Sequence, residues 1–204
     1  NALKSQVVVS VLPTEKGVDV IVLDGGEIRG IHCERAIFAS PMFTAPYLIR
    51  GFRDDPPFAA DAFQHNAWFV ANLFLKDRPK PRFAKDFPLS WDNVLYESPS
   101  LGYVTATHQK GIDYGPTILT YYYPMCHEPD GRTKLFNYDW KQLADVCLTD
   151  LARAHSDIYD LTTRIDIMRW GHAMISPRPN FIWSGVREKA MKPYLNIHFA
   201  HTDL

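Results

Sequence analysis

Two histidines near the C-terminus have a spacing that could support metal chemistry. His198 and His201 lie three positions apart, which on a helix would bring both imidazoles to one face. The surrounding residues 196–200 instead predict a strand, on which the two side chains point to opposite faces. No HExxH pattern or nearby cysteine supplies a further ligand. We therefore predict no metal site.

Two other kinds of reactive side chain also lack a catalytic pattern. Ser184 lacks the GxSxG context of a hydrolase nucleophile. Cys33, Cys126 and Cys147 are odd in number and far apart, so they form neither a disulfide framework nor a CxxC pair. We expect free thiols in a reduced compartment, which favours the cytoplasm, and we leave open an export signal on a preceding part of the polypeptide. No catalytic acid, base or nucleophile is assigned.

Aromatic residues on predicted strands could instead line a substrate cavity. Trp68, Tyr103 and the run from Tyr121 to Tyr123 would give apolar walls that orient a substrate carbon. Because side chains alternate along a strand, Tyr122 faces opposite to Tyr121 and Tyr123, so these three cannot line one pocket. Ordinary sheet packing also accounts for them, because Tyr and Trp favour strands. We choose Trp68, Tyr103 and Tyr122 as pocket candidates.

The composition limits the class of protein. The chain has 204 residues, 46% of them hydrophobic, as in a folded globular protein. It has 22 Lys and Arg against 23 Asp and Glu, so no basic field is available for nucleic acid. The uncharged stretch 36–49 contains two prolines and is too short to cross a bilayer. We expect neither a nucleic-acid partner nor a membrane span.

The N-terminal 40 residues predict a β-meander. Its strands are expected at 7–11, 18–23, 28–33 and 34–39, with turns at Gly17 and at residues 24–26. The valines at 7–9 break the alternation, which suggests burial on both faces. A short helix at 42–49 and a surface connection at 51–60 should follow.

The remaining residues predict a sheet covered by helices. A helix should start at Trp140, capped by Asn137, and end near residues 155–157. Residues 127–131 indicate a turn between strands, and 77–88 a loop. The expected fold class is α+β, a large, mixed and mostly antiparallel sheet flanked by helices and preceded by a small β-meander. Its strands are expected at 65–76, 93–97, 101–107, 117–123 and 161–170.

The order of three short motifs resembles the flavin-containing amine oxidase family. Ala36-Ile-Phe-Ala-Ser-Pro41 matches the strand by which that family leaves its cofactor domain. Trp170 and Ile197-His-Phe-Ala200 match the return to the flavin. The resemblance spans about residues 7 to 204. Because the chain ends where the return strand would reach the flavin, we expect an internal piece of a larger FAD-dependent oxidoreductase that is inactive alone.

The resemblance implies a domain plan and a set of sites. Residues 3–41 would adjoin the missing FAD-binding domain of the same polypeptide, 42–190 would form the substrate domain, and 191–204 would be the return strand. The parent would transfer hydride from a C–H bond of a small-molecule substrate to FAD, which the fragment itself should not bind. His172 joins the substrate-pocket candidates. The implied cofactor contacts are Ser40, Pro41, Trp170, Phe199, Ala200, His201 and Thr202.

Three departures from the family pattern concern its chemistry. None of the 11 glycines forms the GxGxxG that holds a dinucleotide pyrophosphate. His201-Thr202 stands where the family has Gly-Glu, and residues 64–68 lack the Lys that many amine oxidases place near the flavin. Desaturation and other flavin chemistry therefore remain open beside amine oxidation.

Two alternatives to an enzyme follow from the same residues. The chain could be a non-catalytic α+β module that binds an apolar ligand or a protein partner in an aromatic cavity. A structural interaction domain would instead show a broad exposed apolar patch. The oxidoreductase hypothesis requires the strands at 36–39 and 196–200 to be adjacent, since both must reach one cofactor.

Overall fold

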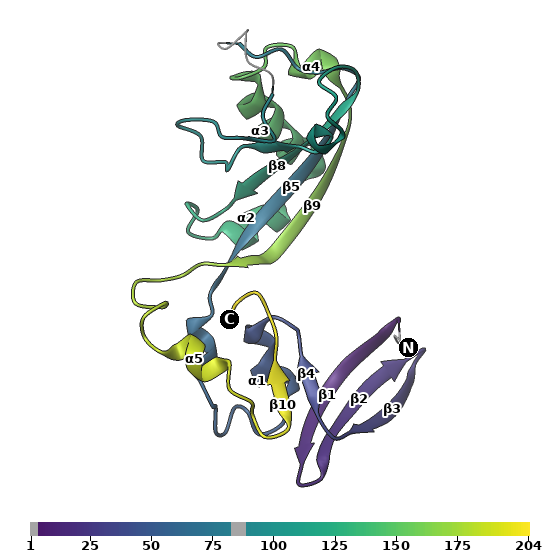
Figure 1. Ribbon diagram of the computed structural model, residues 1–204, viewed down its shortest axis with the longest axis vertical. Helices are drawn as coiled ribbons and strands as arrows, with labels where there is room; N and C mark the ends of the chain where they lie inside the picture. The colour runs from purple at the N-terminus through teal and green to yellow at the C-terminus, as the bar shows by residue number, and fades with distance from the viewer. Residues whose placement is uncertain (1–3, 83–88) are drawn as a thin grey trace. The chain divides into compact units, whose positions relative to one another are not determined.

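The computed structural model describes residues 4–82 and 89–204 and divides into two compact units (Figure 1). Unit 1 combines Asn1–Gln64 with Ile175–Leu204, and unit 2 is His65–Met174. The predicted division into residues 3–41, 42–190 and 191–204 describes how each segment would relate to a cofactor domain. The two units do not test it, and it stays a prediction. Among the described residues, no helix has the length and apolar character needed to cross a membrane.

Unit 1 begins with the predicted meander. Strands β1 (Gln6–Thr14), β2 (Gly17–Asp24) and β3 (Glu27–Cys33) pair antiparallel in that order. Gly17 is required at the first turn because a Cβ atom there would lie 2.2 Å from the carbonyl oxygen of Cys33. The backbone of the turn between β1 and β2 therefore packs directly against the backbone at the end of β3.

The predicted double burial of the first strand is wrong. Val7, Val8 and Val9 are 59%, 40% and 44% exposed. The register of β1 against β2 shifts between Val8 and Ser10, which leaves Val9 as an extra residue. This bulge, rather than two buried faces, breaks the alternation.

The strand expected at 34–39 does not continue the meander. It is shorter, β4 (Ala36–Phe38), and pairs in parallel with β10 (Ile197–Phe199). The required adjacency of residues 36–39 and 196–200 is thus confirmed. Phe38 of β4 packs edge to face with Phe199 of β10, in the cluster that also contains Val11 and Val18 of the meander, and this contact supports the pairing of β4 with β10.

Short helices and buried aromatic rings complete unit 1. The helix expected at 42–49 is present as a 3-10 turn, η1 (Met42–Thr44), followed by α1 (Ala45–Leu48). The 3-10 helix η2 (Ala60–Ala62) and α5 (Val186–Ala190) lie further along the chain. The connection at 51–60 is not wholly a surface segment, because Phe52 and Phe58 pack edge to face in the core.

Unit 2 contains a five-stranded sheet with the order β6-β7-β8-β5-β9. Strand β5 alternates cleanly, with its odd-numbered side chains buried from Ala67 to Leu75. Together with the helices, this sheet confirms the α+β class. The strands are β5 (His65–Leu75), β6 (Asp92–Asn93), β7 (Tyr103–Thr105), β8 (Thr117–Pro124) and β9 (Thr162–Ile175).

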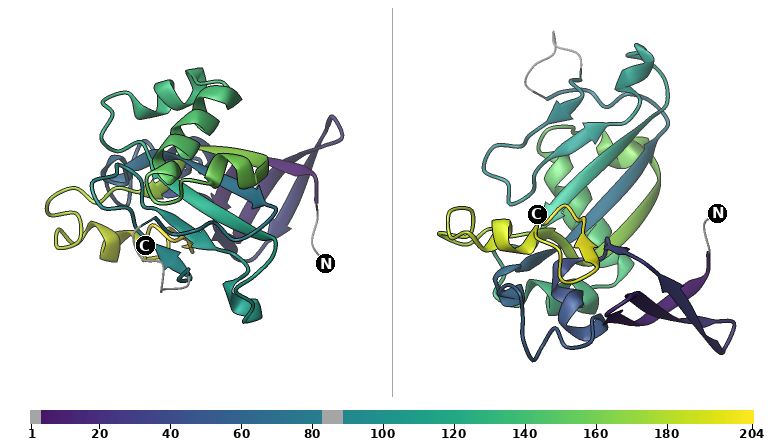
Figure 2. Two further views of the ribbon diagram at one scale, coloured as in Figure 1. Left: turned by 90° about the horizontal axis from the view of Figure 1, so that it is seen from above. Right: turned by 60° about the horizontal axis from the view of Figure 1, so that its bottom comes forward.

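Three helices cover one face of this sheet (Figure 2). They are α2 (Gly131–Asn137), α3 (Trp140–Ala152) and α4 (Ile158–Leu161). Their buried residues pack on the odd-numbered face of β5, and each fully buried large apolar side chain stabilises the fold by about 1.5–3 kcal/mol. The short 3-10 helix η3 (His108–Lys110) follows β7.

Several details of unit 2 differ from the sequence predictions. The expected turn at 127–131 leads directly into helix α2, and Asn137 is the last residue of that helix rather than the cap of α3. Asp139 caps α3 instead, in a capping box with Gln142. Strands expected at 93–97 and 101–107 shorten to β6 and β7. Of the loop expected at 77–88, residues 83–88 lie outside the described residues.

Candidate functional site

The parallel pair in unit 1 brings two predicted cofactor segments to one edge. Ala36, Ile37 and Phe38 of β4 lie opposite Ile197, His198 and Phe199 of β10. Because parallel strands end at the same edge, the segments 39–42 and 200–203 leave the pair side by side. Ligands of α/β sheets bind outside such carboxyl edges. The predicted contacts at Ser40, Pro41, Ala200, His201 and Thr202 therefore share one place.

Hydrogen bonds hold these two segments together. The backbone N–H of Ala200 donates to the carbonyl of Phe38 at 3.1 Å. The carboxylate of Asp203 accepts a hydrogen bond from the N–H of Met42 at 3.2 Å and lies 3.0 Å from Nδ1 of His201. Asp203 is buried, and sequence reasoning missed it because its partner Met42 is 161 positions away. No local pattern in the sequence signals this pairing.

The side chains at this edge differ in what they can offer. Ser40, Ala200 and Thr202 are exposed, and His201 is partly exposed. The side chain of Phe199 packs against Phe38 in the core, so it cannot present its ring at the edge. The edge therefore offers two hydroxyls, an imidazole and the backbone beside a small alanine.

Unit 2 presents a second feature, the sheet face opposite the helices. We call it the open face and define it by Trp68, Asn72, Tyr122, Trp170 and His172 with their same-face neighbours. In β5 the even-numbered side chains are only partly buried, and Val70 lies opposite Tyr122 of β8. Side chains of paired residues point to the same face, so Trp68 and Tyr122 share it. Thr120 and Asn72 form a 2.8 Å hydrogen bond there.

Strand β9 places Trp170 and His172 on the same face. A Cβ atom on Gly171 would meet Arg132 and Phe136 of α2, so position 171 faces the helices. Alternation turns positions 170 and 172 to the other face. Trp170 is 49% exposed and its same-face neighbours Met168 and Met174 are 50% and 53% exposed, which makes this part of the face apolar and accessible.

Tyr103 does not join the other pocket candidates. It lies opposite Tyr121, on the helix-covered face, and both residues are buried. Its hydroxyl lies 2.6 Å from Nε2 of His155. Burial raises its pKa far above the ordinary value, so the phenol stays neutral. Strand alternation therefore turns the pocket candidates Trp68, Tyr122 and His172 to one face, together with Trp170, which was predicted as a cofactor contact. The pairing of Tyr103 with Tyr121 turns Tyr103 to the other face.

His172 has a neighbour that the sequence did not single out. The ring of His65 meets it edge to face with centroids 6.2 Å apart. Burial, then the nearby Arg132 and His65, lower the pKa of His172, so the neutral imidazole is favoured at neutral pH. His172 therefore lies as a neutral imidazole against the ring of His65. In the described ranges, no three His, Cys, Asp or Glu side chains gather to hold a metal ion.

Comparisons with known proteins give a fold but no close relative. No family model and no curated protein matches the chain. A putrescine oxidase triple mutant with redesigned cofactor binding has 16% identity and a TM-score of 0.67, over 97% of this chain and 43% of that one. Cyclohexylamine oxidase from Brevibacterium oxydans has 12% identity and a TM-score of 0.64, over 97% and 42%.

A third solved structure shows that the same fold occurs with a different activity. A fatty acid isomerase from P. acnes, which produces CLA, has 13% identity and a TM-score of 0.54, over 96% of this chain and 42% of that one. This chain thus spans less than half the length of each of these proteins. It has the fold of the corresponding part of the flavin-containing amine oxidases, as the sequence resemblance predicted.

Proposed function

We propose that this chain is part of an FAD-dependent oxidoreductase that removes hydride from a C–H bond of a small molecule. The observation that carries the proposal is the parallel pairing of β4 with β10, within a fold shared with amine oxidases. That pairing gives the exit and return segments a common edge, as a cofactor contacted by both requires. In this proposal residues 42–190 form the substrate domain.

The residues at the edge fit a flavin ring but not the rest of FAD. Within the described residues, the hydroxyls of Ser40 and Thr202 make no hydrogen bond, and both side chains are exposed. They could donate to ring oxygen and nitrogen atoms, while Ala200 leaves its backbone approachable. The chain has no GxGxxG to hold the pyrophosphate. We therefore propose that a further domain of the same polypeptide holds the dinucleotide.

The open face supports a role in substrate binding. A bound flavin would supply the hydride acceptor. The rings of Trp68, Tyr122 and Trp170 would exclude water and orient the substrate carbon, and the neutral His172 could hydrogen-bond a polar substrate group. We assign no proton transfer to these residues, because no acid or base on this face is placed against a substrate.

Reduction of the flavin under anaerobic conditions tests the proposal. The intact protein would be mixed with primary amines and, separately, with unsaturated fatty acids, and the oxidised flavin band followed. We expect at least one class to bleach the band, and Trp170→Leu to slow bleaching about tenfold or more through lost substrate orientation. Ile182→Leu, at an exposed position of unit 1, is the control. A protein that carries no flavin and takes none up would contradict the proposal and favour the non-catalytic binding module.

A further inference from the structure

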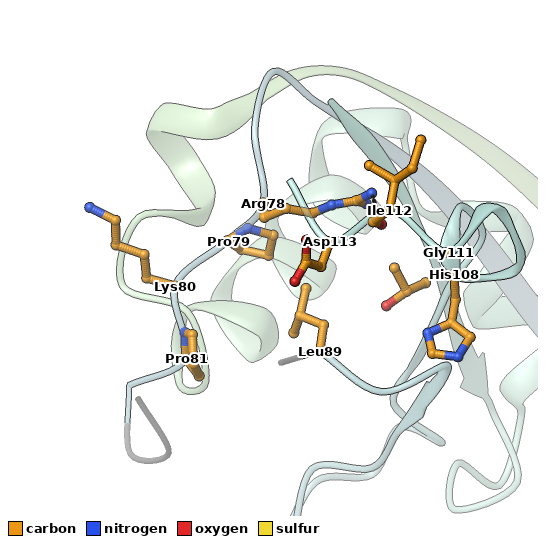
Figure 3. A pocket seen from close by; sticks show the side chains of 10 residues that line it. Arg78, Pro79, Lys80, Pro81, Leu89, His108, Gly111, Ile112 and Asp113 are labelled. Carbon is orange, nitrogen blue, oxygen red and sulfur yellow. Dashed lines mark hydrogen bonds between the residues drawn. The ribbon is translucent and has the colours of Figure 1, made fainter. Parts of the chain in front are cut away.

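A cavity in unit 2 lies apart from the open face and has no role in the proposed function. It measures about 580 Å³ and lies where the chain turns after β5, beside η3 (Figure 3). Its volume is in the range of small-molecule sites. Its lining residues are Arg78, Pro79, Lys80, Pro81, Leu89, Thr105, His108, Gly111, Ile112 and Asp113.

Two buried polar atoms of lining residues, Nε of Arg78 and Oγ1 of Thr105, have no hydrogen-bond partner among the residues that the structure describes. Nη1 of Arg78 donates to Oγ1 of Thr107, and Nη2 donates to the carbonyl of Ile112 at 2.8 Å. These bonds fix the guanidinium, yet its buried Nε–H remains unpaired. Oγ1 of Thr105, a residue only 3% exposed, is unpaired as well. Because each buried unpaired group costs about 1–3 kcal/mol, two such groups on residues that line one cavity favour a polar partner there.

The cavity also carries two charged side chains, Arg78 and Asp113, that form no ion pair with any residue in the described ranges 4–82 and 89–204. Figure 3 shows the Asp113 carboxylate directed toward Leu89 and Pro79, while the Lys80 side chain points away from them. A fixed guanidinium and a carboxylate in one cavity are complementary to a molecule that bears both an anionic and a cationic group.

We propose that this cavity binds a zwitterionic small molecule, an amino acid with an apolar side chain. Its carboxylate accepts hydrogen bonds from Nε of Arg78 and from the hydroxyl of Thr105. Its ammonium group lies toward Asp113. Its side chain packs on the apolar walls formed by Pro79, Leu89 and Ile112. The inference does not depend on the proposed function, because no cofactor or open-face residue takes part.

Three matched probes test the charge requirement. L-leucine carries both groups, 4-methylpentanoate lacks the ammonium, and 3-methylbutylamine lacks the carboxylate. Binding to the intact protein would be measured by calorimetry up to about 10 mM, where weak sites are still detected. We expect leucine to bind at least about tenfold more tightly than either analogue, the value of one charge-assisted contact. Equal binding of all three, or of none, overturns the proposal and leaves a cavity that holds water.

Variants assign the binding to these side chains. Thr105→Val keeps the shape of the side chain and removes the unpaired hydroxyl, so folding should be unharmed while leucine binds about tenfold more weakly. Asp113→Asn should weaken leucine binding but leave 4-methylpentanoate unaffected. Lys110→Ala, in η3 but outside the lining, is the control and should bind normally. Unchanged leucine binding in Thr105→Val would contradict the assignment.

Discussion

The carboxylate of Asp150 accepts hydrogen bonds from several buried hydroxyls of unit 2, so its substitution should lower the free energy of unfolding. Oδ2 accepts hydrogen bonds from Oγ of Ser98 at 2.7 Å, Oγ of Ser100 at 2.8 Å and the hydroxyl of Tyr121 at 2.9 Å. Oδ1 lies 3.2 Å from Nη1 of Arg153. One side chain of α3 thereby ties the segment before β7 to the centre of the sheet.

The size of the effect follows from which partners remain buried. Asp150→Ala leaves three hydroxyls without this acceptor, and two of them belong to Ser100 and Tyr121, which are nearly inaccessible to solvent. Ser98 and Ser100 can still pair with each other at 2.8 Å. We therefore expect a loss of about 3–5 kcal/mol in unfolding free energy, because two or more buried hydroxyls each lose a hydrogen bond to a charged acceptor, worth about 1.5–3 kcal/mol. The half-exposed Arg153 adds little, because solvent screens that pair.

Urea unfolding of the intact protein measures this loss. With a slope of about 2 kcal/mol per molar, the midpoint for Asp150→Ala should fall by about 1.5–2.5 M. Asp145→Ala, at an exposed position of the same helix, is the matched control and should change the free energy by less than about 0.5 kcal/mol. If Asp150→Ala were as mild as Asp145→Ala, the hydroxyl cluster would not stabilise the fold and the reasoning would fail.

Three further predictions concern a cap, a histidine and the cofactor edge. Asp139→Ala should lower the melting temperature through a loss of about 1 kcal/mol, because the capping box of α3 is removed; circular dichroism would detect it. Burial lowers the pKa of His155, so the unfolded chain binds the proton more readily and unfolding free energy should fall as pH drops below about 6.5; denaturation of His155→Gln should show a flatter dependence on pH. Asp203→Ala should speed hydrogen exchange at the Met42 amide about tenfold or more, because that buried N–H loses its acceptor. Mass spectrometry would measure the exchange rate, and an unchanged rate would contradict this hydrogen bond.

Local periodicity was enough to predict the elements with the strongest patterns. Strand β5 alternates over its whole length, and the buried positions of α3 follow helical spacing from Leu143 to Leu151. The adjacency of β4 and β10 followed from the family resemblance, because no local pattern in residues 36–39 indicates a partner at 196–200. The faces of Trp68 and Tyr122 could be predicted only relative to their own strands.

The failures have specific physical causes. Helix α2 was missed because Pro129-Asp130-Gly131 has turn composition, yet the helix begins within it. The exposure of Val7 to Val9 follows from a bulge, which depends on the register of a partner strand. Tyr103 was chosen as a pocket candidate because it is an aromatic residue on a predicted strand. Its face depends on its pairing with Tyr121, which no feature of its own strand reveals. Asp203 and its partner Met42 are too far apart in sequence for any local pattern.

The absorbance spectrum of the intact protein, with identification of any chromophore released on denaturation, is the most direct test of the central claim. The account predicts oxidised flavin bands and release of FAD. It also predicts that Thr202→Val, which removes an exposed hydroxyl from the β4–β10 edge, shifts the reduction potential or the band position of the bound flavin. A folded, colourless protein that does not take up added FAD would contradict the account.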